Sequence, residues 1–134
     1  MTHVGRLASL CTLVLLLGGL GACAAPSPPR RPAPILHLVW FQLHDPADAE
    51  GLLADCEDLL EPIPSVVCYA AGRHLDIGRD NVDADYDLAL LVGFDDVDGY
   101  QAYLTHPDHL LLIERWGERI ESYRVQDVLD QPAR

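Results

Sequence analysis

Tyr103, His106 and His109 lie within seven residues of one another and carry side chains suited to proton transfer. A histidine titrates near neutral pH and can act as a base, and a tyrosine hydroxyl can donate to an oxygen that gains charge. Each also has a structural alternative. His106 can cap a helix because Pro107 follows it, His109 can bond a neighbouring backbone group, and Tyr103 can be a core aromatic. Residue type alone leaves both interpretations open.

A second candidate site is the acidic stretch from 80 to 87, which contains Asp83-x-Asp85-x-Asp87. Alternating carboxylates are typical of calcium loops, but an EF-hand loop beginning at Asp83 would need glycine at its sixth position and glutamate at its twelfth. Leu88 and Phe94 stand there instead. The sequence therefore predicts a solvated acidic loop and no metal site, with an irregular cation site as the alternative.

The third reactive candidate is Cys23, which ends an apolar run with a small-residue exit. The run spans 7–20 and follows Arg6, a pattern typical of a secretory signal. Leu20-Gly21-Ala22-Cys23 resembles the lipobox of bacterial lipoproteins, whose new N-terminal cysteine carries acyl chains such as palmitate. We expect a signal peptide at 1–22, lipidation at Cys23, and an extracytoplasmic lipoprotein anchored to a membrane of the cell envelope. An ordinary signal peptide and an uncleaved anchor are the alternatives, although a spanning helix needs about 20 apolar residues.

Charge and length narrow the possible partners. Cleavage before Cys23 would leave 112 residues, enough for one domain. These residues carry eight arginines and 21 acidic side chains, a net charge of −13. Such a surface repels nucleic acid and anionic headgroups, so we expect no nucleic-acid partner and a membrane contact made by the lipid alone.

Cys56 and Cys68 are the thiols that remain after the leader and the lipidated residue are set aside. A bond between them would close a short loop and contribute on the order of 3 kcal/mol in the chain-entropy model. The alternative is two separate thiols that pack as small apolar residues. A metal site is not expected, because no CxxC pair is present.

The rest of the chain predicts one α+β domain behind a proline-rich tether at 23–34. Strands are expected at 35–43, 66–71, 86–94 and 120–129. A helix should begin at Asp45-Pro46 and stop at Pro62, and two shorter helices should span 97–104 and 107–118. This order is the split βαβ, ferredoxin-like plan with its second helix broken in two, and we place the domain at 35–130.

A sheet covered by helices on one face leaves its other face to be buried elsewhere. Depending on register, the open face carries His37, Val39 and Phe41, or Leu38 and Trp40. Either set is too apolar for water, and such a patch usually marks an interface or a binding groove. Two copies that face each other would close a barrel, so we expect a homodimer.

Ile35 to Leu129 resembles the stress-responsive dimeric α/β-barrel (Dabb) family. The matching stretches are HLVWF at 37–41, IPSVV at 63–67 with Gly72-Arg73, YDLALLV at 86–92, and AYLTHPDH at 102–109. The last is the most specific, because a tyrosine before HPxH is a recognisable feature of the family. The resemblance implies a ferredoxin-like dimeric α/β barrel, and implies little about activity because most members have no assigned reaction.

Some plant relatives are polyketide cyclases, and the resemblance to them implies three tentative catalytic residues: His37, Tyr103 and His109. His109 would be the base, Tyr103 its orienting partner or the carbonyl donor, and His37 a polar group of the pocket. Together with Val39 and Phe41 these residues would line a ligand pocket at the barrel core.

Three functions follow as hypotheses. The first is a tethered homodimer that binds a small apolar or aromatic molecule in its barrel, and an extracytoplasmic address favours this one. The second is a cyclase- or isomerase-type enzyme that uses His109 and Tyr103 for proton transfer. The third is a structural or stress-associated protein whose barrel binds nothing. Related barrel families include haem-degrading and quinol monooxygenases, but no axial-ligand signature is evident here, so no cofactor is predicted.

Overall fold

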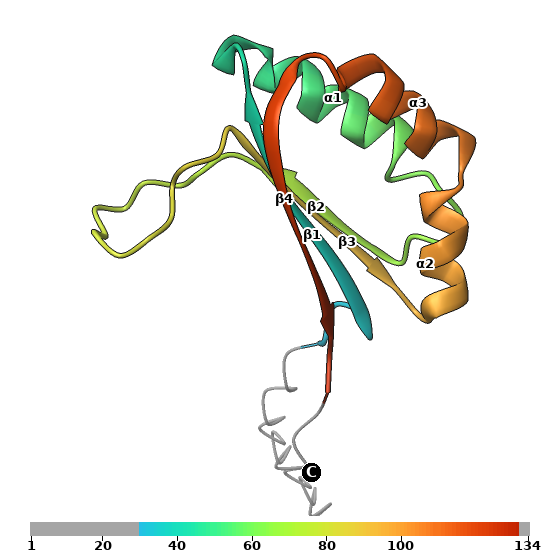
Figure 1. The fold of residues 1–134 in the computed structure, drawn as a ribbon. Coiled ribbons are helices and arrows are strands. Elements are labelled where there is room, and N and C mark those ends of the chain that lie inside the picture. Colours follow the sequence, from blue (N-terminus) through green and yellow to red (C-terminus); the bar gives the residue numbers. More distant parts are fainter. Residues whose placement is uncertain (1–29, 132–134) are drawn as a thin grey trace, which may run out of the picture.

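Four antiparallel strands form one sheet, and the α-helices pack against a single face of it (Figure 1). The computed structural model describes residues 30–131. The predicted signal peptide at 1–22, the predicted lipidation site Cys23 and most of the tether at 23–34 lie outside these residues. The strand order is β2-β3-β1-β4, and the predicted ferredoxin-like α+β fold is confirmed.

Strand β1 (Ile35–Leu43) is the central strand that positions the rest of the sheet. It pairs on one side with β3 (Leu88–Phe94) and on the other with β4 (Ile120–Leu129). Strand β2 (Cys68–Gly72) pairs with the outer side of β3. Strands β2 and β3 each begin two residues later than predicted, because Val66 enters a turn that bonds to Ile63, and the residues before Leu88 belong to the preceding loop.

Three acceptor side chains begin the helical segments. Asp45 accepts from the backbone of Ala47 and starts the short 3-10 helix η1 (Pro46–Asp48), which leads into α1 (Ala49–Leu59). Asp96 caps α2 (Val97–Leu104), and His106 caps α3 (Pro107–Trp116). Such caps satisfy backbone donors that have no partner inside the helix. Among the helices of residues 30–131, none is long and apolar enough to cross a membrane.

Residues along β1 alternate between the helix-covered face and the open face of the sheet. His37, Val39, Phe41 and Leu43 are buried beneath the helices, whereas Leu38 and the residues that alternate with it are half-exposed on the other face. Of the two registers that the sequence allowed, the structure adopts the one with Leu38 and Trp40 on the open face. The core packs these strand residues against the helices, with Leu52, Cys56, Leu60, Leu88, Leu90, Val92, Phe94, Tyr103, Leu112 and Trp116 as its other large members.

The last residues of the proline-rich segment pack against the domain. Ala33 is only 4% exposed, and the backbone of Asp130 donates to the carbonyl of Pro34 at 2.8 Å. Arg31 forms an ion pair with the Asp130 carboxylate. The domain therefore makes contacts from Arg31 onward, slightly before the predicted start of the first strand.

Of the two alternatives for Cys56 and Cys68, the structure has the separate thiols: both are free and no disulfide joins them. Cys56 is a residue of α1 and is buried in the core between helix and sheet, where burial and the nearby Asp55 and Glu57 raise its thiol pKa to about 12. Cys68 lies in register with Gly93, next to Leu36, on the open face of the sheet. Because the two side chains lie on opposite faces of the sheet, no bond can form without unfolding part of it.

Candidate functional site

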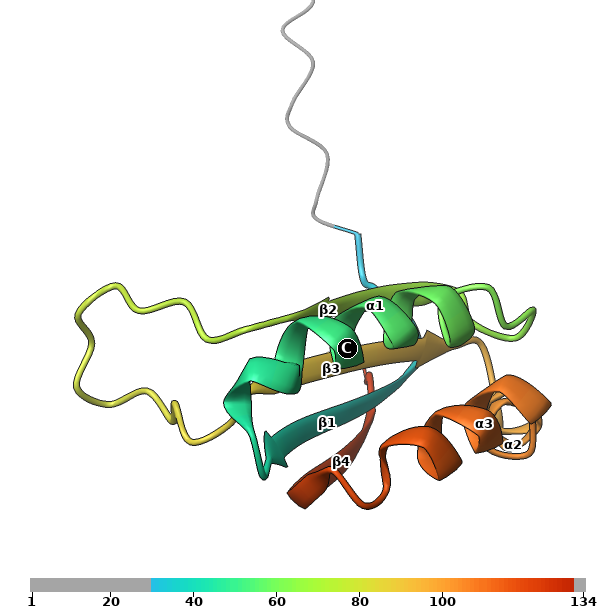
Figure 2. The same ribbon diagram turned by 90° about the horizontal axis from the view of Figure 1, so that it is seen from above.

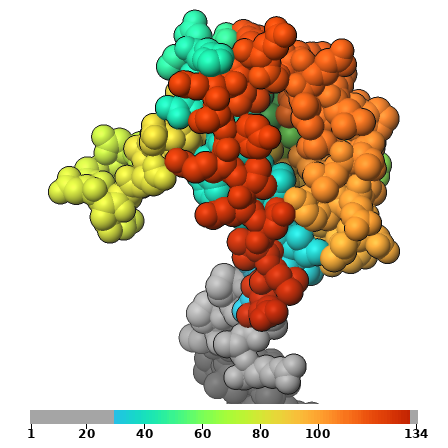
Figure 3. Space-filling view, viewed as in Figure 1, coloured from blue at the N-terminus to red at the C-terminus, as the bar shows by residue number. Residues whose placement is uncertain are grey.

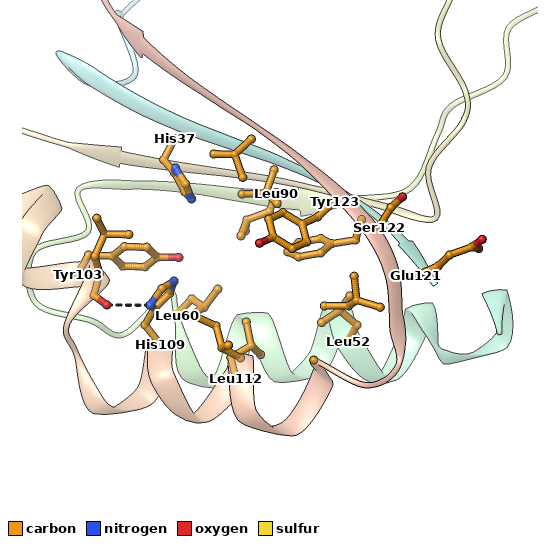
Figure 4. A pocket seen from close by; sticks show the side chains of 17 residues that line it. His37, Leu52, Leu60, Leu90, Tyr103, His109, Leu112, Glu121, Ser122 and Tyr123 are labelled. Atoms are coloured by element: carbon orange, nitrogen blue, oxygen red, sulfur yellow. Dashed lines mark hydrogen bonds between the residues drawn. The ribbon is translucent and has the colours of Figure 1, made fainter. Parts of the chain in front are cut away.

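A pocket of about 630 Å³ lies between the sheet and the helices of a single protomer (Figure 4). The sequence predicts a cavity in the barrel between two copies, whereas this pocket lies on the opposite, helix-covered face of the sheet. All five predicted pocket residues line it. The lining comprises His37, Val39, Phe41, Leu52, Leu60, Leu90, Tyr103, Leu104, His109, Leu112, Ile113, Gly117, Ile120, Glu121, Ser122, Tyr123 and Val125.

The mouth of the pocket lies between β4 and α3. The lining residues Tyr123 and Val125 on β4 and Ile113 on α3 are exposed to solvent. In the space-filling view the surface is hollowed between β4 and the helical layer (Figure 3). Strand β4 touches the sheet only through β1, so a molecule can reach the core beside it without disturbing a helix.

His109 lies in the first turn of α3, at one end of the pocket, and is held by a hydrogen bond to the last residue of α2. Its Nδ1 donates to the carbonyl of Leu104 at 3.1 Å, so that in the neutral ring Nε2 is an acceptor. Figure 4 shows the ring directed into the cavity beside Tyr103. Burial lowers the pKa of His109, and the nearby His37 and His106 act in the same direction. His109 is therefore a neutral base at neutral pH.

Tyr103 comes from α2 and brings a hydroxyl to the same end of the pocket (Figure 4). The side chain is 1% exposed, and its ring lies 4.5 Å from that of His109 between centroids. Burial, with smaller effects from Cys56 and Tyr100, raises the pKa of the Tyr103 hydroxyl. The group therefore stays protonated and can donate a hydrogen bond to a molecule in the pocket.

His37 completes this end of the pocket and is held from behind by two residues that the sequence did not reveal. Its Nδ1 lies 2.8 Å from Asp127 Oδ1 and 2.8 Å from the Tyr100 hydroxyl, which itself donates to Asp127 at 2.9 Å. A carboxylate only accepts, so Nδ1 carries the proton. In the neutral ring, Nε2 is thus left as an acceptor on the pocket side. His37 is only 7% exposed.

Tyr100 reinforces this arrangement. Burial, together with the hydrogen bond to and the charge of Asp127, raises the pKa of its hydroxyl. The hydroxyl therefore remains a donor to the carboxylate that orients His37. One signal in the sequence could have found Asp127: it lies on β4 in the alternation set of Tyr123 and Val125, so a carboxylate stands among pocket-facing residues.

The other candidate residues have structural roles. The His106 side chain accepts from the backbone of Asp108 at 3.2 Å, which is the capping role considered from the sequence. Asp83 pairs with Arg124 at 3.1 Å, and Asp87 accepts from the backbone of Leu43 at 2.8 Å. The acidic triplet is thus divided among separate partners, and residues 30–131 contain no group of three potential ligands placed to hold a metal.

Chemically, the pocket combines an apolar body with one polar end. Its walls are aliphatic and aromatic, while His37, Tyr103 and His109 bring two imidazole nitrogens and one hydroxyl to the same end. A cavity of this size, with a few converging polar groups, is typical of small-molecule sites.

Solved structures of similar proteins share this architecture. A dimeric ferredoxin-like protein of unknown function from Thermobifida fusca is 26% identical, with a TM-score of 0.60, and the match covers 71% of this chain and 89% of that one. A Dabb-family protein with a ferredoxin-like fold from Mesorhizobium loti is 25% identical, with a TM-score of 0.59, covering 73% and 97%.

An enzyme is also among the similar structures. A hydroxynitrile lyase from Passiflora edulis has a TM-score of 0.65 at 15% identity, covering 77% of this chain and 98% of its own, so the likeness is one of fold. No curated protein matches the sequence. The family model of the stress responsive A/B barrel domain (Dabb) matches residues 35–130. The resemblance inferred from the sequence is thereby confirmed, and the chain belongs to the Dabb family.

Proposed function

We propose that this protein binds a small aromatic molecule that carries a hydroxyl or carbonyl group. The observation that carries this proposal is the pocket of about 630 Å³, whose walls are apolar and whose polar groups gather at one end. Stacking and burial would hold the aromatic body against Phe41, Leu90 and Leu112. The polar group would meet Tyr103 as donor and His109 as acceptor.

The exposed apolar face of the sheet bears on how copies of the protein assemble. The open face of the sheet carries Leu36, Leu38, Trp40 and Leu91, all half-exposed, and an apolar face of this kind usually marks an interface. We propose that two copies cover this face in a homodimer. The dimeric relative from Thermobifida fusca supports this assembly.

The N-terminal segment supports a membrane address. The lipobox-like stretch before Cys23 and the proline-rich segment after it fit a lipoprotein whose domain is held close to a bilayer of the cell envelope. A membrane surface concentrates apolar molecules, so a tethered domain would meet its ligand there. This setting favours binding over the chemistry of soluble, activated intermediates.

The binding proposal is tested by calorimetric titration with 2-naphthol, a planar aromatic with one hydroxyl. The wild-type protein should bind with a Kd between roughly 10 µM and 1 mM, as expected for a small ligand that gains apolar burial and one or two hydrogen bonds. Leu112→Trp should abolish the heat of binding, because Leu112 is buried and lines the pocket.

Leu111→Trp is the matched control, since Leu111 neighbours Leu112 on α3 but is partly exposed and does not line the pocket. It should bind 2-naphthol as the wild type does. Absence of saturable binding in the wild type would contradict the proposal and favour a protein whose interior binds nothing.

A second candidate function is enzymatic proton transfer of the cyclase or isomerase type. The observation that favours it is the pairing of a neutral base, His109, with a protonated donor, Tyr103, at one end of the pocket. His109 Nε2 would take a proton from the carbon next to a carbonyl, and Tyr103 would stabilise the enolate oxygen. The proton would then return to carbon.

This candidate predicts faster exchange of the α-protons of 1-tetralone, an aromatic ketone, in D₂O, followed by NMR. His109→Gln should remove the acceleration, while 2-naphthol should still bind with an affinity lowered by no more than about fivefold, the loss expected for one hydrogen bond. If the wild type gives the uncatalysed rate, this second function is excluded for that class of carbonyl compound, and the binding proposal is unaffected.

A further inference from the structure

Residues 73–87, here called the arm, connect β2 to β3 and project beyond the ends of these strands, away from the helices (Figures 1 and 2). The arm is mainly polar and acidic, but three of its large apolar residues are exposed: Leu75, Ile77 and, to a smaller extent, Val82. Leu75 is 77% exposed and Ile77 is 69% exposed. Side chains of this kind cost solvation free energy unless something covers them.

Contacts to the sheet hold the return leg of the arm. Asp83 pairs with Arg124 on β4 at 3.1 Å, and the Gln42 amide on β1 donates to Asp85 at 3.2 Å. Asp87 bonds to both backbone groups that face it, donating its N–H to Phe41 and accepting from the N–H of Leu43.

The outgoing leg and its tip also have a defined shape. His74 packs edge-on against Tyr86 with 6.1 Å between ring centroids, which joins the two legs. The Asp76 carboxylate accepts from the N–H of Gly78 at 2.8 Å, and Gly78 adopts a φ of +76° that favours glycine. Leu75 precedes this turn and Ile77 is its middle residue, and both side chains are exposed to solvent.

A groove of about 300 Å³ lies on the open face of the sheet, at the end from which the arm departs. Leu38 and Trp40 on β1, Ala70 on β2, and Leu91 on β3 form most of its apolar lining. Arg73, the first residue of the arm, stands at its rim. The groove can therefore accept an aliphatic side chain but is not filled by its own chain.

The arm cannot supply that side chain to its own groove. It starts at the groove rim with Arg73 and leads away from the sheet, which leaves Leu75 and Ile77 exposed in the single protomer. A second copy related by a two-fold axis solves the problem for both partners at once, because each arm then meets the other groove. The dimeric relatives of similar fold support a two-copy assembly.

We propose that Leu75 and Ile77 of the arm occupy the open-face groove of a second copy, and that this exchange secures the homodimer. The inference rests on the proposed homodimer and adds a specific interface to it. Each copy provides one arm and one groove, so the contact closes upon itself and does not propagate into fibres.

Site-directed cross-linking tests the contact directly. Leu75→Cys and Ala70→Cys are introduced into separate full-length chains, each with Cys68→Ser, and the detergent-solubilised proteins are mixed under a mild oxidant. A covalent dimer should form in the mixture. Val97→Cys replaces Leu75→Cys as the control, since Val97 is also exposed, at 57% against 77% for Leu75, but lies on α2, on the other side of the sheet.

A second measurement distinguishes the contact made by the arm from dimerisation through other surfaces. Leu75→Asp with Ile77→Asp should raise the dimer dissociation constant at least tenfold in sedimentation experiments. Val97→Asp with Leu110→Asp, two exposed positions on the helices, should leave it unchanged. A dimer that forms no arm cross-link and is insensitive to the arm substitutions overturns this inference but leaves the homodimer standing. A wild-type monomer at all concentrations overturns both.

Discussion

At the scale of single residues, the pocket depends on how three polar side chains are held. His109 is fixed by the carbonyl of Leu104, and His37 by Asp127 and Tyr100. Tyr103 is placed by packing, with its ring 5.1 Å from that of Phe94 between centroids. Because a backbone carbonyl or neighbouring side chains hold these three residues in place, their pocket-facing atoms are free to meet a ligand.

Tyr103→Phe tests the donor role directly. The variant keeps the aromatic ring and its packing but removes the hydroxyl, so the affinity for 2-naphthol should fall about fivefold, corresponding to the loss of about 1 kcal/mol for one hydrogen bond. Naphthalene has no hydroxyl, and its affinity should change little. Fluorescence titration with both compounds measures the difference. An equal loss for the two compounds would assign Tyr103 a purely packing role.

His109 should give the protein a defined pH dependence of stability. Its folded-state pKa lies below the ordinary value of 6.5, mainly because of burial, so the unfolded chain binds the proton more readily. The contribution of this residue is fully present above pH 6.5 and is lost as the pH falls below it.

The measurement is the free energy of urea unfolding of wild type and His109→Gln between pH 5 and 7.5. The difference between them should shift in favour of the variant as the pH falls, because glutamine does not titrate. A difference that is constant over this range would contradict burial of a neutral His109.

Sequence reasoning identified His37, Tyr103 and His109 but not the residues behind His37. Tyr100 and Asp127 are 63 and 90 positions away from it, and their meeting depends on the register of β4 against β1 and on where α2 docks. Neither follows from local pattern. Alternation along β4 groups Asp127 with Tyr123 and Val125, but only the register that pairs it with His37 shows which side chain the carboxylate holds.

At the scale of elements, local chemistry explains most boundaries. Asp45 and Asp96 cap as their positions suggest, and Pro107 starts its helix after His106. The strand limits were less accurate, since turns at 63–66 and contacts of the arm replace ladder pairing. Strand alternation also explains why Cys56 and Cys68 form no disulfide, because it places Cys68 on the open face of the sheet, away from Cys56.

Gly93, on β3, is the glycine of residues 30–131 at which an added side chain would have the least room. A Cβ there would come within 2.6 Å of the Cβ of Ala33 and 2.9 Å of that of Cys68. Gly93→Ala should therefore cost about 1–3 kcal/mol of stability through overpacking. Urea unfolding followed by tryptophan fluorescence measures the change.

Gly72→Ala is the matched control, because nothing lies within 4 Å of the Cβ that it would add. It should alter stability by no more than about 0.5 kcal/mol. Equal effects at the two glycines would mean that the approach of Ala33 to β3 does not constrain the sheet.

At the scale of the whole molecule, the two faces of the sheet have different tasks. The helix-covered face holds the pocket, and the open face carries the apolar groove. The sequence alone could not predict which residues of β1 face the helices, because both alternating sets on this strand are apolar. Only the placement of the helices shows that His37, Val39 and Phe41 belong to the protomer's own interior.

The proposed membrane address also belongs to this scale. Cys23→Ser should move the protein from the membrane fraction to the soluble periplasmic or external fraction, because the serine hydroxyl cannot receive the thioether-linked lipid. Cell fractionation with immunodetection measures the shift. Cys68→Ser, which leaves the lipobox-like stretch intact, is the control. An unchanged distribution of Cys23→Ser would contradict lipid anchoring.

The central claim is that a small aromatic ligand enters the pocket between sheet and helices. The most direct test is to measure intermolecular nuclear Overhauser effects from 2-naphthol to the methyl groups of the labelled protein. We expect contacts to Val39, Leu90 and Leu112, which line the pocket. Contacts confined to Leu38 and Leu91 would instead place the ligand in the open-face groove and contradict the account.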